Sequence, residues 1–190
     1  YDMVPQGISA DLIATVEGFS REELDQLAVD SQARAARAQA EGRFDRSLVP
    51  IFHDDGSLAL AIDEHPRAGT TLEDLAKLQP SFAGMGGHVQ EGRELSIDAT
   101  ALKAYPQLSE IRHVHHGGNS SGVVDGASAL LLASPDYATA HGMTPRAKVT
   151  MAAVAGDEPV IMLTAPGPAT DLVLRKAGMT LADIDRKSVV

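Results

Sequence analysis

Cysteine is absent from this chain of 190 residues. The chain can therefore form no disulfide, no thiolate metal site and no cysteine nucleophile of its own. Aromatic residues make up only 4% of the sequence, so a core must be built mainly from Ala, Val, Leu and Ile. The remaining composition, 44% hydrophobic and 22% charged, is typical of a globular protein rather than of a disordered chain.

Basic residues and long apolar runs are also scarce. The chain has 16 Lys and Arg against 26 Asp and Glu, a formal charge of -10, which argues against a general nucleic-acid binder. No apolar run approaches the roughly 20 residues of a membrane span. No basic segment followed by an apolar stretch suggests a secretory signal. We therefore expect a cytoplasmic protein that binds neither nucleic acid nor membrane.

The first part of the sequence predicts helices and one hairpin. Ser20 and Glu23 form a capping box at the start of a helix that Gly42 ends. Its inner face is expected to carry Leu24, Leu27, Ala28, Ser31, Ala35 and Ala38, and its outer face Glu22, Asp25, Arg34, Arg37 and Glu41. The apolar runs 48–52 and 58–62 flank an Asp-Gly turn and predict a hairpin. Thr70 with Glu73 predicts a second capping box, and 83–96 reads as loop.

From about residue 123 the pattern changes to alternating strands and helices. Residues 127–133 and 147–155 are almost wholly apolar and predict buried strands. Ser134-Pro135 predicts the start of a helix to His141, and 168–177 predicts a helix that Gly178 ends. This order favours an α/β layer.

Three polar features leave functional and structural interpretations open. His113, His115 and His116, with His88, could hold a metal, but they lack an HExxH motif, and a polar loop is the favoured interpretation. The Gly-rich segment 117–122 could cradle a phosphate or form a structural turn.

Arg67 could bind a phosphate, or it could only form surface ion pairs with nearby carboxylates. Ser121 and Ser134 lie outside any GxSxG motif, and Ser134 is expected to be a helix cap, so a serine hydrolase is not indicated.

Four blocks, in this order and spacing, resemble the thiolases, the acyl-CoA acetyltransferases of fatty-acid and sterol metabolism. The blocks are residues 20–44, 63–82 (DEHPRAGTTLEDLAKLQPSF), 117–134 (GGNSSGVVDGASALLLAS) and 158–185. The resemblance covers residues 7–185. It implies an α/β, partial thiolase-like fold: residues 1–115 would be a loop domain covering coenzyme A. Residues 116–185 would end the first half of the αβαβα core and begin the second.

The resemblance also implies a coenzyme A site without metal. Its expected residues are Arg67 near the nucleotide, Phe82 beside adenine or pantetheine, Gly117, Ser121 and Val123 along pantetheine, and Met162 near the thioester. Coenzyme A thioester would be a substrate, and no cofactor would be bound permanently. His116-Gly117 replaces the Thr-Ala of the family, which makes the loop more polar, and Asp74 and Gln79 also depart from the family pattern.

The implied function is that of an internal thiolase fragment. The whole enzyme, a homodimer or homotetramer, would cleave 3-ketoacyl-CoA or condense acyl-CoAs through a cysteine acyl-enzyme. The family's catalytic cysteine and histidine motifs are not found in this sequence, so the fragment is expected to be inactive alone. Residues 186–190 are expected to be a non-native tail, because DRKSVV is what a sequencing adapter encodes in one frame. The alternative is a non-catalytic coenzyme A-binding or interaction module.

Overall fold

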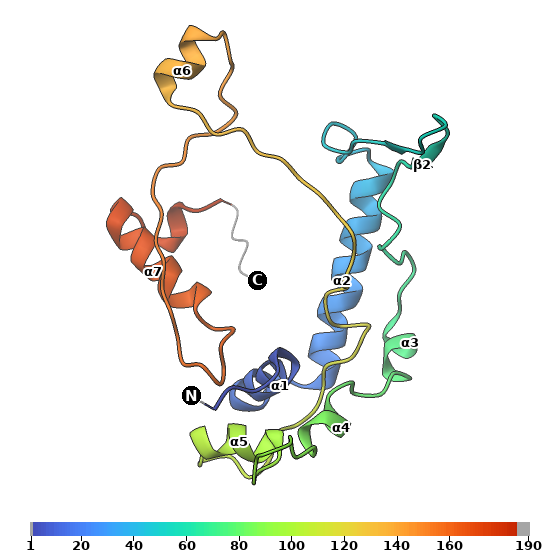
Figure 1. The fold of residues 1–190 in the computed structure, drawn as a ribbon, viewed down its shortest axis with the longest axis vertical. Helices are drawn as coiled ribbons and strands as arrows, with labels where there is room; N and C mark the ends of the chain where they lie inside the picture. The colour runs from blue at the N-terminus through green and yellow to red at the C-terminus, as the bar shows by residue number, and fades with distance from the viewer. Residues whose placement is uncertain (1, 186–190) are drawn as a thin grey trace. The chain divides into compact units, whose positions relative to one another are not determined.

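The computed structural model describes residues 2–185, so the expected non-native tail at 186–190 lies outside the described residues. The chain divides into two compact units, Tyr1–Val124 and Asp125–Val190. Figure 1 shows their helices and strands along the chain. The boundary at residues 115 and 116, which the resemblance implies between the two domains, stays a prediction.

The first unit is mostly helical. Its helices are α1 (Gln6–Glu17), α2 (Arg21–Ala40), α3 (Leu72–Ala76), α4 (Ala83–Gly86) and α5 (Ile97–Ala104). Its strands β1 (Ile51–Phe52) and β2 (Leu58–Leu60) pair antiparallel, with Ile51 opposite Leu60 and Phe52 opposite Leu58. The predicted hairpin is therefore confirmed, and Gly56 supplies its turn with φ of +83°.

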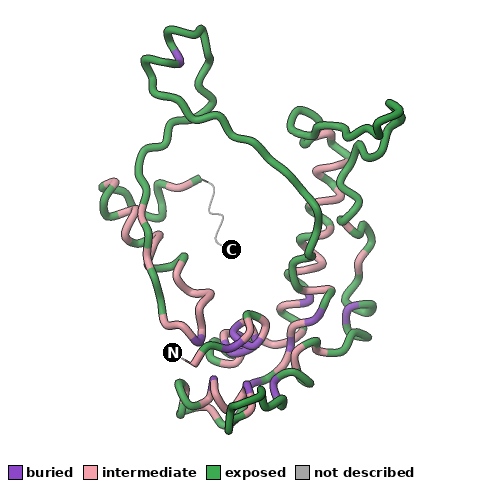
Figure 2. Tube along the Cα trace, viewed as in Figure 1, coloured by how far each residue is buried: buried purple, intermediate pink, exposed green. Residues whose placement is uncertain are grey.

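The core of the first unit lies on α1 (Figure 2). Ile8 and Leu12 are fully buried, and α1 packs against α5, whose Ile97 and Ala101 are also buried. Ile111 and Val114, from the extended segment after α5, are also buried. With few aromatic residues, aliphatic side chains do supply this core.

Helix α2 begins and ends as its sequence predicts. Ser20 accepts a hydrogen bond from the Glu23 N–H, and the Glu23 carboxylate accepts one from the Ser20 N–H. Gly42 follows the helix in the left-handed region, with φ of +62°.

The predicted faces of α2 are wrong at three positions: Asp25 is buried, whereas Leu27, at 64%, and Ser31 are exposed. The side of α2 that faces inward is set by His116 and Asn119, which are distant in the sequence and bind the Asp25 carboxylate.

Two predictions between the hairpin and α5 need correction. Helix α3 is capped by Thr71, whose hydroxyl accepts from the Asp74 N–H, one residue later than the predicted cap at Thr70. Thr70 instead donates its hydroxyl hydrogen to the Arg67 carbonyl, 2.8 Å away. The segment 83–96 is not wholly loop, because it contains α4.

The second unit contains α6 (Pro135–Ala140), α7 (Pro166–Ala177) and a 3₁₀ turn, Leu181–Asp183. Ser134 caps α6 and Gly178 ends α7, as predicted. The predicted strands at 127–133 and 147–155 are wrong for this structure, because both segments are extended without ladder pairing. A strand is stable only when its backbone groups pair with a neighbour, and within residues 2–185 these segments pair with none.

Among the described residues, no helix has the length and apolar character that crossing a membrane requires.

Candidate functional site

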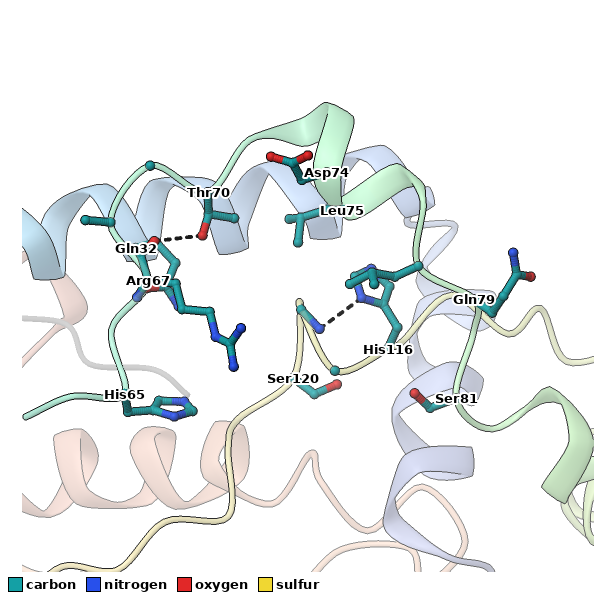
Figure 3. A pocket seen from close by; sticks show the side chains of 15 residues that line it. Gln32, His65, Arg67, Thr70, Asp74, Leu75, Gln79, Ser81, His116 and Ser120 are labelled. Carbon is teal, nitrogen blue, oxygen red and sulfur yellow. Dashed lines mark hydrogen bonds between the residues drawn. The ribbon is translucent and has the colours of Figure 1, made fainter.

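A cavity of about 720 Å³ opens in the first unit. Helix α2, the loop 65–70, helix α3 and the turn 116–120 contribute its walls (Figure 3). Leu75 and Leu78 form an apolar side, and Arg67 supplies a positive charge. The cavity therefore combines an apolar wall with a cationic group, a combination suited to a ligand with a hydrocarbon arm and an anionic end.

Polar residues on α2 hold the loops of the cavity in place. Asp25, Gln32 and Gln39 follow one another at intervals of two helical turns, so they lie on one face. The Gln32 Oε1 accepts a 2.7 Å hydrogen bond from the Arg67 N–H. The Gln39 Nε2 donates a 2.9 Å hydrogen bond to the Asp63 carbonyl. The sequence pattern did not predict this stripe, which holds the chain at Asp63 and at Arg67.

The Arg67 side chain is exposed and extends from its loop toward the turn that carries Ser120 (Figure 3). Among residues 2–185, no hydrogen bond or ion pair engages its guanidinium, since only its backbone is bound. Asp74, the acidic residue of the cavity, is already bound by Lys77 at 3.0 Å and Thr71 at 2.8 Å. The guanidinium is thus available to an anionic group of a ligand.

The turn 116–119 is fixed by Asn119. Its Oδ1 accepts from the His116 N–H at 2.8 Å, and its Nδ2 donates to the Val114 carbonyl at 3.1 Å and to the Asp25 Oδ1 at 2.9 Å. Gly118 lies against the apolar wall, where an added Cβ would be 2.5 Å from the Leu75 Cδ2. The turn therefore requires both the amide of Asn119 and the absence of a side chain at position 118.

Asp25 joins this turn to α2 and α3. Its Oδ1 lies 2.8 Å from the His116 Nε2, and its Oδ2 accepts a 2.8 Å hydrogen bond from Arg21. Arg21 also donates to the carbonyls of Leu75 and Leu78, at 2.7 and 3.0 Å. Burial raises the pKa of Asp25, but the hydrogen bonds from His116, Arg21 and Asn119 outweigh burial and lower it. The ionised carboxylate thus fixes two walls of the cavity.

A second buried carboxylate, Asp11 on α1, holds the segment before the turn. Its Oδ1 accepts from the N–H groups of Val114 and His115, both at 3.0 Å, and lies 2.7 Å from the His115 Nδ1. Its Oδ2 lies 2.8 Å from the His113 Nδ1. Burial raises the pKa of Asp11, but the hydrogen bonds from His115, Val114 and His113 outweigh burial, so the pKa is lowered.

The three clustered histidines are bound to carboxylates. His113 lies between Asp11 and Asp98, with its Nε2 3.0 Å from the Asp98 Oδ2. Burial lowers the pKa of His113, but the hydrogen bonds to Asp11 and Asp98 outweigh burial and raise it. His88 is exposed. Within the described part of the chain, no three His, Asp or Glu side chains are placed to hold a metal ion.

The residues expected to contact coenzyme A are distributed unevenly. Arg67 and Gly117 line the cavity. Phe82 is half-buried, and its ring occupies the place where a Cβ on Gly7 would be. Ser121 and Val123 follow the turn in an exposed segment, and Val123 is completely exposed.

Met162 belongs to the second unit. Its φ of +38° is rare for a residue with a side chain. Its N–H donates to the Glu158 carbonyl at 3.0 Å.

Comparison with known proteins identifies the family. Residues 1–102 match the family described as "Thiolase, N-terminal domain". The chain is 36% identical to the 3-ketoacyl-CoA thiolase of Aeromonas hydrophila over 182 residues, which are 94% of this chain and 40% of that protein. It is 37% identical to the beta-ketoadipyl-CoA thiolase of Acinetobacter baylyi over 187 residues, which are 97% of this chain and 39% of that protein.

Solved structures agree with the sequence comparisons. Human mitochondrial 3-ketoacyl-CoA thiolase in complex with CoA matches with a TM-score of 0.73 and 34% identity, over 95% of this chain and 38% of that chain. The likeness confirms a partial thiolase-like fold. This chain spans about 40% of the length of the curated relatives that it matches. With a family match over 102 residues and structural likeness over almost its whole length, the chain belongs to the thiolase family.

Proposed function

We propose that the chain supplies part of the coenzyme A site of an acyl-CoA C-acyltransferase. The whole enzyme would cleave 3-ketoacyl-CoA or condense two acyl-CoAs. The observation that carries this proposal is the Arg67 guanidinium, which no group within residues 2–185 engages, beside the apolar wall of Leu75 and Leu78 in one cavity. Coenzyme A carries phosphates at one end and an uncharged pantetheine arm at the other, and a guanidinium and an apolar wall suit these two ends.

The proposed contacts divide along the ligand. Arg67 would bind a phosphate of the nucleotide, and the backbone at Gly117 would run along pantetheine. Ser121 and Val123 would follow the arm, Phe82 would lie beside adenine or pantetheine, and Met162 would lie near the thioester. In this proposal coenzyme A is a substrate that enters and leaves, so it is not a permanently bound cofactor.

The acyl transfer itself needs a thiolate, and these 190 residues contain no cysteine. We therefore propose that the nucleophile belongs to polypeptide outside this sequence. In the cleavage direction that thiolate would attack the 3-keto carbonyl, break the bond between C2 and C3, and release acetyl-CoA as a carbanion that takes up a proton. The thiol of a second coenzyme A would then displace the cysteine and carry the acyl group away as a new thioester. The chain described here would hold the carrier of that acyl group. We further propose a cytoplasmic homodimer or homotetramer for the whole enzyme.

Calorimetric titration with coenzyme A tests the proposal. We expect weak, saturable binding that Arg67→Ala weakens about ten-fold or more, because a charge-assisted hydrogen bond to phosphate contributes about 1.5–3 kcal/mol. Arg46→Ala is the matched control, since Arg46 is another exposed arginine of the same unit and does not line the cavity. Absence of saturable binding, or an equal loss in both variants, would contradict the proposal.

A further inference from the structure

The hydrogen bonds of His116 require a particular state of its imidazole ring. The Gly118 N–H donates to the His116 Nδ1 at 3.0 Å, so Nδ1 has no proton and acts as an acceptor. The opposite nitrogen, Nε2, lies 2.8 Å from the Asp25 Oδ1, which can only accept. The ring must therefore be neutral, with its one proton on Nε2.

Protonation would break this arrangement. An imidazolium carries N–H groups at both nitrogens, so its Nδ1–H would point at the Gly118 N–H and replace a hydrogen bond with a repulsion. His116 is only 1% exposed, and water cannot readily take the place of the lost acceptor. The Gly118 turn would have to open, and Gly117 and Gly118 line the cavity.

We propose that neutral His116 positions the glycine turn of the cavity, and that its protonation opens the turn and weakens ligand binding there. The inference rests on the proposed function only in taking coenzyme A as the ligand. His116 does not have to touch the ligand, because it acts through the backbone at Gly118. Asp25 is the anchor that sets the ring orientation from α2.

The charged and titratable groups around the His116 ring favour or oppose its protonation. Helix α2 contributes Asp25, an anion that attracts a second proton to the ring, and Arg21, which already pairs with that carboxylate at 2.8 Å and offsets the attraction. Helix α3 contributes Asp74, and the loop 65–70 contributes Arg67 and His65, all lining the same cavity.

On its own segment, His115 is engaged by Asp11. The lowered pKa of Asp25 is consistent with a carboxylate that remains the acceptor for Nε2–H.

His113 provides a contrast within the same segment. Its two ring nitrogens both face carboxylates, Asp11 at 2.8 Å and Asp98 at 3.0 Å. Such a ring can donate at both nitrogens, so protonation strengthens its contacts. Acid should therefore preserve the attachment of His113 to α1 and α5 while it releases the turn at Gly118.

Nuclear magnetic resonance on the nitrogen-15-labelled chain tests the ring directly. At about pH 7.5 we expect an unprotonated Nδ1 and a protonated Nε2 in His116, with a Gly118 amide protected from exchange. At the lower pH where the ring nitrogens report a second proton, we expect that protection to be lost. A ring that gains no second proton, or a Gly118 amide that stays protected after it does, would overturn the proposal. A proton on Nδ1 at about pH 7.5, or a Gly118 amide that is unprotected there, would overturn the proposal.

Coenzyme A titrations at both pH values then test the consequence for binding. H116N keeps an oxygen that can accept from the N–H two residues on, as in an Asx turn, and it cannot titrate. Its affinity should be below that of the wild type at about pH 7.5, since the bond to Asp25 is lost, but above that of H116A.

On acidification, the affinity of the wild type for coenzyme A should fall by a factor about ten times larger than that of H116N. Protonation of the ligand phosphate affects both proteins equally, so it cancels when the two factors are compared. H53N, at an exposed histidine of the hairpin turn, should behave as the wild type. Equal acid losses in H116N and the wild type would overturn the proposal. If coenzyme A binds at neither pH while the ring and amide behave as expected, the proposed function fails and the role of His116 in the turn is supported.

Discussion

In residues 1–124, two buried carboxylates are surrounded by groups distant in the sequence, whereas in residues 125–190 apolar side chains lie exposed in extended segments. Asp11 and Asp25 are 0% and 3% exposed and reach partners about 90 to 105 residues away. Leu130, Leu131 and Leu132 are 72% or more exposed. The buried carboxylates of the first unit thus have their hydrogen-bond partners within that unit. Within residues 125–185, the apolar run at 130–132 has no neighbours that bury it.

The largest expected effect is a loss of stability when one buried leucine of the first unit, but not one exposed leucine of the second, is replaced by alanine. Leu12→Ala should reduce the free energy of unfolding by about 2–5 kcal/mol, because Leu12 is fully buried in α1. Leu131→Ala should change it by less than about 0.5 kcal/mol, since Leu131 is 75% exposed. Urea unfolding followed by circular dichroism measures both. Comparable losses in the two variants would show that residues 127–133 are buried in solution, which would contradict the comparison.

A smaller effect sharpens the description of the cavity. Gly118→Ala should cost about 1–3 kcal/mol of unfolding free energy, because the added Cβ would meet the Leu75 and Leu78 side chains at 2.5 and 2.9 Å. Gly117→Ala is the matched control, since nothing lies within 4 Å of a Cβ there. The same urea experiment distinguishes them. A Gly117→Ala variant as unstable as Gly118→Ala would refute the packing of the turn against α3.

The smallest effect concerns the pH dependence of the first unit. The pKa of His113 is raised in the folded state, so its contribution to stability is fully present below the pKa of the unfolded chain, about 6.5 for histidine. That contribution is lost as pH rises through the higher pKa of the folded state.

The free energy of unfolding of the wild type should thus exceed that of His113→Gln by less and less as the pH rises from about 5.5 to about 8.5. The loss occurs in this range because a raised pKa moves the titration of the folded state to higher pH. His53→Gln, at an exposed position, should show no such change. An advantage that grows toward high pH would contradict the assignment of His113 to Asp11 and Asp98.

Part of the site could be anticipated from the sequence. The resemblance singled out Arg67 and Gly117, and both line the cavity. Asp25, Gln32 and His116 could not be assigned in this way, because each acts through a partner that periodicity does not reveal. The available signal was the repeat of a polar residue every seven positions on α2, at Asp25, Gln32 and Gln39. The small apolar residues between them gave a stronger periodic pattern and set the predicted inner face.

The sequence by itself determined the local features of this protein. Ser20, Ser134 and Gly178 start or end helices, and Asp55-Gly56 turns the hairpin, since each needs only groups within a few residues. Only the tertiary structure decided that Asp25 faces inward and that 127–133 forms no strand. The first depends on His116, 91 residues away, and the second on a neighbouring strand, because a backbone cannot complete its ladder hydrogen bonds alone.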